Sequence, residues 1–133
     1  MAGPITWVSD TVVFALHDRQ IAEHGGADGV RDAGLISSAL ARPKNLSGYE
    51  AADIAALAAS YAFGLARNHG FVDGNKRTAW VVVRLFLRLN GATLVFDAVE
   101  AVALMRDVAA GGTGEAQLAG WFRARMAGSD TAK

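Results

Sequence analysis

Apolar residues recur at helical spacing along most of this chain, and glycine, proline and N-capping residues separate the resulting segments. Counting caps, the pattern predicts an all-α domain with helices over residues 9–24, 32–42, 50–68, 75–90, 97–110 and 113–126. The expected N-caps, whose side-chain oxygens would accept a free backbone N–H, are Ser9 or Asp10, Asp32, Asp97 and Thr113. No repeat or low-complexity tract interrupts the pattern, so residues 1–133 are predicted to form a single domain.

The segments around these helices carry further expectations. Proline cannot donate a backbone hydrogen bond, so Pro43 should end the second helix and leave residues 44–49 irregular. Residues 24–31 should form a glycine-rich loop with a short β-like flap, and residues 129–133 should be a frayed tail. Because most of its circumference is apolar, the helix over residues 75–90 is predicted to be the central, buried one.

The most informative segment is the motif at residues 69–77, HGFVDGNKR, which precedes the fourth predicted helix. Helix N-termini normally favour Asp and Glu, because their unpaired N–H groups carry partial positive charge. Lys76 and Arg77 in the first turn oppose this preference. They are explained if backbone N–H groups and cationic side chains together hold an anion such as a phosphate. The motif is not a Walker loop, because Gly70 and Gly74 lack the required spacing.

Each polar residue of the motif also has a structural interpretation. His69 could be a general base toward a hydroxyl, although a lone histidine near a helix end usually bonds a carbonyl. Asp73 could hold Mg²⁺ beside substrate phosphates, could cap the following helix, or could do both. Asn75, Lys76 and Arg77 could be a solvated first turn, but three anion-binding groups after a glycine favour a phosphate site.

Composition narrows the classes of function. The chain has no cysteine, which excludes disulfides, zinc–thiolate sites and thiol nucleophiles. Its 13 basic and 13 acidic residues give a formal net charge of zero, so neither direct nucleic-acid binding nor membrane binding is expected. No signal peptide is visible, and a cytoplasmic protein is expected. His17 lies on an apolar face and should be buried and satisfied, and the three histidines are too dispersed for a convincing metal cluster.

The motif at residues 69–77 resembles the signature of the Fic/Doc superfamily, and specifically that of the Doc toxins. The Fic signature reads H-x-F-x-D/E-A/G-N-G-R, and Doc toxins have lysine in place of its second glycine, as this chain has Lys76. The resemblance extends back to Leu16 and forward to Asp97, and so covers well over half of the chain. It implies a compact Fic/Doc-type bundle of about six helices around a central buried helix. The flap at residues 24–31 would align a target segment by strand addition.

The resemblance also implies a reaction. Doc toxins transfer the γ-phosphate of ATP to a threonine of elongation factor Tu and arrest translation, whereas Fic enzymes transfer AMP to a protein hydroxyl. By analogy His69 is the general base, and Asp73 assists through Mg²⁺ or by orienting groups. Lys76 and Arg77 complete the catalytic set. The residues that would bind the phosphates of ATP are Arg67, Gly74, Asn75, Lys76 and Arg77.

The sequence also carries expectations about how the protein is inhibited. No glutamate in the chain is followed by glycine or asparagine, so the inhibitory S/T-x-x-x-E-G/N helix of many Fic proteins is absent. The resemblance therefore implies a separate Phd-like antitoxin, whose C-terminal segment would fold into an apolar groove beside the site.

Gly70 replaces a proline common after the histidine and is expected to loosen the loop without removing activity. The alternatives are a Fic-type AMP transferase and a catalytically idle partner-binding module.

Overall fold

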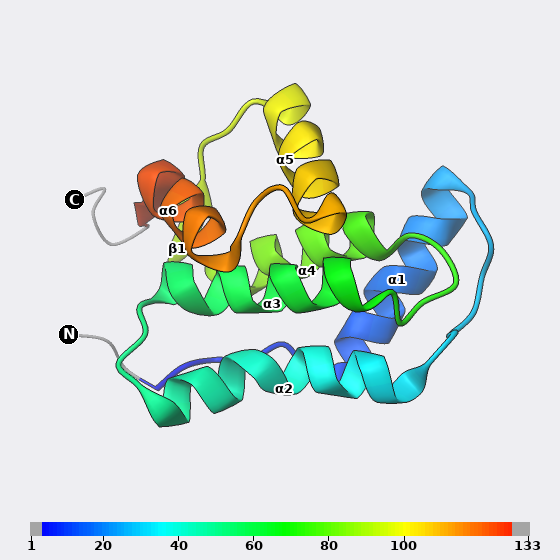
Figure 1. The fold of residues 1–133 in the computed structure, drawn as a ribbon, viewed down its shortest axis with the longest axis horizontal. Coiled ribbons are helices and arrows are strands. Elements are labelled where there is room, and N and C mark those ends of the chain that lie inside the picture. The colour runs from blue at the N-terminus through cyan, green and yellow to red at the C-terminus, as the bar shows by residue number, and fades with distance from the viewer. Residues whose placement is uncertain (1–3, 129–133) are drawn as a thin grey trace.

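The computed structural model describes residues 4–128 as six helices and one small sheet (Figure 1). In chain order the elements are α1 (Asp10–His24), α2 (Ala33–Tyr49), α3 (Ile54–Asn68), α4 (Asn75–Leu89), β1 (Ala92–Leu94), α5 (Ala98–Ala110), α6 (Glu115–Arg125) and β2 (Met126–Gly128). The predicted helical bundle is confirmed. None of the helices within the described residues is long and apolar enough to cross a membrane.

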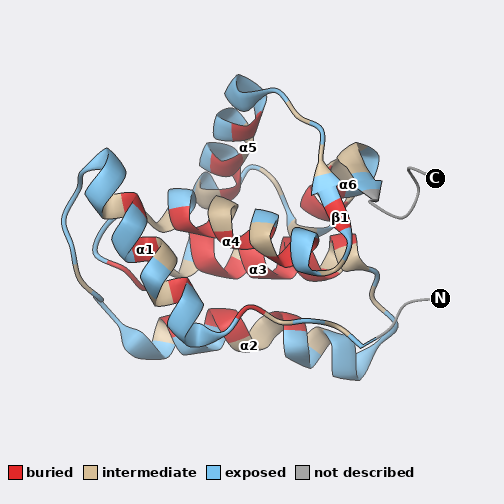
Figure 2. Ribbon diagram, turned by 180° about the vertical axis from the view of Figure 1, so that it is seen from behind, coloured by how far each residue is buried: buried red, intermediate tan, exposed pale blue. Residues whose placement is uncertain are grey.

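The helix α3 lies at the centre of the bundle, with α2 along one side and α5 and α6 on the opposite side (Figure 1). Ten of its 15 residues are buried, against six of the 15 in α4. Figure 2 shows the buried positions gathered on α3 and on the inner faces of its neighbours. The prediction that residues 75–90 form the central helix was therefore wrong. Alanine and glycine on α3 let other helices approach from several sides, as where Gly64 packs against Ala39 of α2.

The helix α2 continues through Pro43 to Tyr49, so the predicted break and the irregular segment 44–49 were wrong. Pro43 is buried, and Leu46 packs against the hydrophobic core one turn later. A proline inside a helix removes one backbone hydrogen bond. Burial of this apolar face against the rest of the bundle outweighs that loss, which the local sequence alone does not indicate.

Three of the predicted N-caps are confirmed by side-chain hydrogen bonds. Ser9 accepts from Val12 N, Asp32 from Leu35 N, and Asp97 from Glu100 N. The predicted cap Thr113 is wrong by one residue. Gly114 occupies the N-cap of α6, while the Thr113 hydroxyl instead bonds the side chain of Asp107.

The β structure is more extensive than the predicted flap. The flap forms an isolated antiparallel bridge between Val30 and Phe71. The two-stranded antiparallel sheet of β1 and β2 was not predicted, because three-residue strands carry too little periodicity to be recognised. The predicted frayed tail at residues 129–133 lies outside the described residues.

Candidate active site

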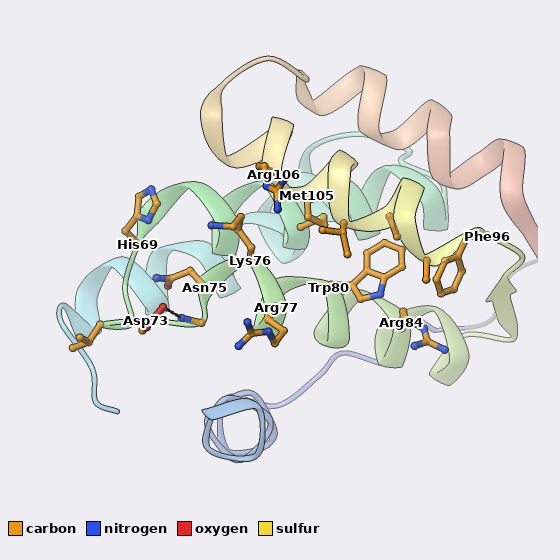
Figure 3. Close-up of a pocket in the computed structure, with 15 residues that line it drawn as sticks. His69, Asp73, Asn75, Lys76, Arg77, Trp80, Arg84, Phe96, Met105 and Arg106 are labelled. Atoms are coloured by element: carbon orange, nitrogen blue, oxygen red, sulfur yellow. Dashed lines mark hydrogen bonds between the residues drawn. The ribbon is translucent and has the colours of Figure 1, made fainter. Parts of the chain in front are cut away.

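A cleft of about 680 Å³ opens between the motif loop, α4 and α5 (Figure 3). Six of the predicted site residues line it, and these are His69, Asp73, Gly74, Asn75, Lys76 and Arg77. Nine further residues complete its walls: Val72, Trp80, Arg84, Phe96, Ala98, Ala101, Val102, Met105 and Arg106. The structure therefore gathers most of the motif around one cavity.

The cationic end of the cleft is the first turn of α4. Gly74 is the N-cap in a left-handed conformation with φ of +77°, and no side chain caps the helix. Asp73 is therefore not the N-cap, which corrects that interpretation of its role. Neither Lys76 nor Arg77 forms an ion pair among residues 4–128, and both are exposed. Uncapped N–H groups and two unpaired cations make this turn suitable for a phosphate group.

The loop that precedes α4 is held by two polar side chains. Asn75 Oδ1 accepts from Phe71 N at 3.0 Å, and Asn75 Nδ2 donates to Phe71 O at the same distance. His17 Nε2 lies 2.8 Å from Asp73 O, and its ring stacks on Phe71 with centroids 3.7 Å apart. The prediction of a buried, satisfied His17 is confirmed. Asn75 was predicted to bind phosphate, but its side chain is occupied with shaping the loop.

Asp73 is ionised at neutral pH and joins the motif to the flap. Its carboxylate accepts from Gly74 N at 2.8 Å and from Ala27 N at 3.3 Å. These bonds, with smaller contributions from Arg77 and Lys76, hold the pKa of the Asp73 carboxyl below its ordinary value. An exposed carboxylate that lines this cleft fits Mg²⁺, which takes one or two carboxylates and completes its shell with phosphate and water.

His69 lies at the end of α3 with its side chain lining the cleft (Figure 3). It is exposed, and no hydrogen bond holds its ring within the described part of the chain. The structural interpretation of a ring bonded to a carbonyl is therefore not observed in residues 4–128. An exposed imidazole without a partner can accept a proton from a hydroxyl that enters the cleft.

Arg67 does not line the cleft. Its guanidinium lies over the ring of Phe63, 5.2 Å from the centroid. Of the predicted phosphate-binding residues, it is the one that the fold leaves outside the cavity. Arg67 belongs to the last turn of α3, whereas His69 is the left-handed residue that ends the helix, so their closeness in sequence does not align the two side chains.

Sequence reasoning missed the apolar half of the cleft. Trp80 packs edge-on against Phe96 with centroids 5.1 Å apart, and Arg84 lies over the Phe96 ring at 5.2 Å. Trp80 and Arg84 follow Lys76 at four-residue steps, so a helical projection could have placed them on the same face. Phe96 and the α5 residues are far away in sequence, and no local signal indicates that they close the cavity.

Gly70 is buried and does not loosen the loop. Its carbonyl accepts from Arg31 N at 2.8 Å and from Asp32 N at 2.9 Å. A Cβ atom added at Gly70 would overlap the Ile36 side chain and lie 3.1 Å from the Ile36 backbone N. The loop therefore packs directly on the first turn of α2, and the expectation of a looser loop was wrong.

Gly70→Ala should lower the free energy of unfolding by about 1–3 kcal/mol, because the added methyl group meets backbone as well as side chain. Urea denaturation of both proteins would measure this difference. Gly120→Ala is the matched control, since its Cβ meets nothing within 4 Å and alanine is the better helix former by roughly 0.5–1 kcal/mol. An unchanged urea midpoint for Gly70→Ala would show that the loop does not pack on α2 in this way.

Comparison with known proteins identifies relatives by their sequence. A model of the Fic/DOC family matches residues 7–87. The chain is 37% identical to the "Protein kinase doc" of Escherichia phage P1 over 123 residues, which covers 92% of this chain and 96% of that protein. It is 46% identical to the "Toxin Doc" of Mycolicibacterium smegmatis over 89 residues, or 64% of this chain and 68% of that protein.

Proposed function

Because the chain belongs to the Fic/DOC family, we propose that it is the toxin of a Phd/Doc-type toxin–antitoxin pair. It would act in the cytoplasm and transfer the γ-phosphate of ATP to a threonine hydroxyl of elongation factor Tu, which arrests translation. The observation that carries this proposal is Lys76, which occupies the first turn of α4 on the cleft, where the Fic signature has glycine. The relative that matches nearly the full length of both chains bears the name of a protein kinase.

The residues of the cleft suggest how the transfer would proceed. His69 removes the proton from the threonine hydroxyl, whose oxygen attacks the γ-phosphorus while the bond to the bridging oxygen of ADP breaks. Lys76, Arg77 and the N–H groups of the first turn of α4 neutralise the phosphate oxygens. Mg²⁺ beside Asp73 would supply further positive charge to these oxygens. Phosphoryl transfer depends mainly on positioning and charge neutralisation, and the cleft offers both.

Lys76 is also the feature that separates phosphate transfer from AMP transfer. In Fic enzymes, the glycine in the N-G-R part of the signature leaves room for the phosphates of the bound nucleotide. A lysine side chain in its place would crowd these phosphates. In Doc toxins the nucleotide binds in the reverse sense and presents its γ-phosphate to the histidine. A side chain at position 76 that lines the cleft therefore supports transfer of the γ-phosphate.

The target segment would pair with the flap. Gly29 O and Arg31 N bond the motif loop, so the N–H and C=O of Val30 point to the opposite edge. Val30 is 45% exposed, and no backbone bond of its N–H or C=O is present among residues 4–128. An extended segment around the threonine could add to this edge and bring the hydroxyl toward His69.

The apolar half of the cleft fits the proposed antitoxin. Trp80, Phe96 and Val102 provide apolar surface, and Arg84 and Arg106 lie along the same cavity. An amphipathic helix with acidic residues at its edges would match this combination of apolar area and positive charge. A Phd-like C-terminal segment bound there would occlude the nucleotide-binding end and inhibit the enzyme.

Intact-mass spectrometry of elongation factor Tu would test the proposal. After incubation with ATP and Mg²⁺, the factor should gain the mass of one phosphate, and peptide mapping should place it on a threonine. Gain of AMP would contradict the kinase assignment and identify a Fic-type AMP transferase. Growth arrest that persists in His69→Ala without any modification of the factor would instead indicate the idle binding module.

A further inference from the structure

The backbone of His69 has a left-handed conformation that is uncommon for a residue with a side chain. With φ of 52° and ψ of 47°, it is the sole non-glycine residue with positive φ among residues 4–128. The Cβ atom of an L-residue crowds the backbone in this region, so the conformation persists only when neighbouring contacts hold it. Since the ring forms no hydrogen bond within the same residues, its direction depends on how this backbone is held.

Arg31 of the flap supplies these contacts. Its Nε donates to His69 O at 2.7 Å, and its Nη2 donates to Asn68 O at 3.3 Å. Its backbone N–H donates to Gly70 O at 2.8 Å. Arg31 thus bonds three successive carbonyl groups, those of His69 and of the residues on either side.

These bonds also give partners to carbonyl groups at the C-terminal end of α3. The last carbonyl groups of a helix have no partners within the helix. A planar guanidinium can meet two neighbouring carbonyls in one fixed arrangement, whereas the single ammonium of lysine offers no such fork. No other described side chain donates to the His69 carbonyl.

We propose that Arg31 is a positioning residue that fixes His69 in the direction required for proton transfer. This inference rests on the proposed function, because it takes His69 as the general base. Arg31 does not line the cleft, so it acts through the His69 backbone and not on the substrate. It also adjoins Val30, whose open edge is the proposed docking position for the target. The same short segment therefore bonds the backbone of His69 along one edge and leaves its other edge open for the proposed target segment.

Steady-state phosphate transfer to elongation factor Tu by the full chain tests this role. Arg31→Ala should lower kcat by about 10- to 100-fold, because a misplacement of a reacting group by about 1 Å can cost that much. The KM for ATP should stay unchanged, because Lys76 and Arg77 are untouched. Arg31→Lys should recover part of the rate, and added methylguanidine should restore activity to Arg31→Ala. Arg88→Ala, which removes an exposed cation from α4 outside the cleft, should behave as the unaltered protein.

A second measurement does not depend on catalysis. The NMR signals of His69 and Gly70 should shift in Arg31→Ala, while those of core residues such as Phe86 stay in place. Unchanged His69 signals, or an unchanged kcat, would overturn the role given to Arg31. The role would also be overturned if kcat fell together with the melting temperature and methylguanidine did not restore it. If the unaltered protein transfers no phosphate but the His69 signals move as expected, the proposed function fails while the placement of His69 by Arg31 stands.

Discussion

His69→Ala should reduce phosphate transfer to elongation factor Tu by about 10²–10⁴-fold, the usual contribution of a positioned general base. The His69 ring lines the cleft and has no hydrogen bond in the described part of the chain, so its removal leaves no buried polar group unpaired. The melting temperature should therefore change little. Labelling with γ-³²P-ATP would measure the rate, and growth arrest in cells should be relieved in parallel.

Two further variants separate the base from the backbone. His69→Asn keeps a residue type that tolerates the left-handed conformation but removes the imidazole, so it should lose as much activity as His69→Ala. Lys44→Ala removes an exposed side chain from α2, away from both the cleft and the flap, and should keep full activity. Retention of transfer in His69→Asn would show that the backbone conformation, and not the imidazole, is what the reaction needs.

The double variant Lys76→Ala/Arg77→Ala should lose ATP affinity and transfer rate together. Removing one preorganised donor from a charge-stabilising site typically raises the barrier by about 2.7–4 kcal/mol, or roughly 10²–10³ in rate. Both side chains are exposed and form no ion pair within residues 4–128, so neither stabilises the fold through a salt bridge. Isothermal titration with ATP and Mg²⁺ would measure the affinity, and a labelled-phosphate assay the rate.

A second double variant controls for the general loss of two positive charges. Lys44→Ala/Arg88→Ala also removes one lysine and one arginine, both exposed and both outside the cleft. This control should bind ATP as the unaltered protein does, because unspecific attraction is not the source of affinity. Full ATP affinity in the Lys76/Arg77 variant would refute the assignment of the phosphate site to the first turn of α4.

Local signals were sufficient for much of the helical fold. The capping oxygens of Ser9, Asp32 and Asp97 bond backbone groups three residues away, so their effect can be read within a single turn. The interpretation of His17 succeeded for a similar reason, because a histidine on an apolar face has few stable outcomes other than burial with a partner. By contrast, Pro43 was misjudged because its burial in the core depends on neighbouring helices.

The chain itself determined the chemical groups of the site and their order. The motif at residues 69–77 places an imidazole, a carboxylate and two cations around a helix start, and a helix start exposes free N–H groups wherever it occurs. Tertiary structure alone decided which groups face the cavity. It brought Phe96 and α5 against Trp80, and it placed the Arg31 side chain against the carbonyl groups of Asn68 and His69. These choices rest on contacts between segments distant in sequence, whose geometry is fixed by how the helices pack and not by the order of residues within any one of them.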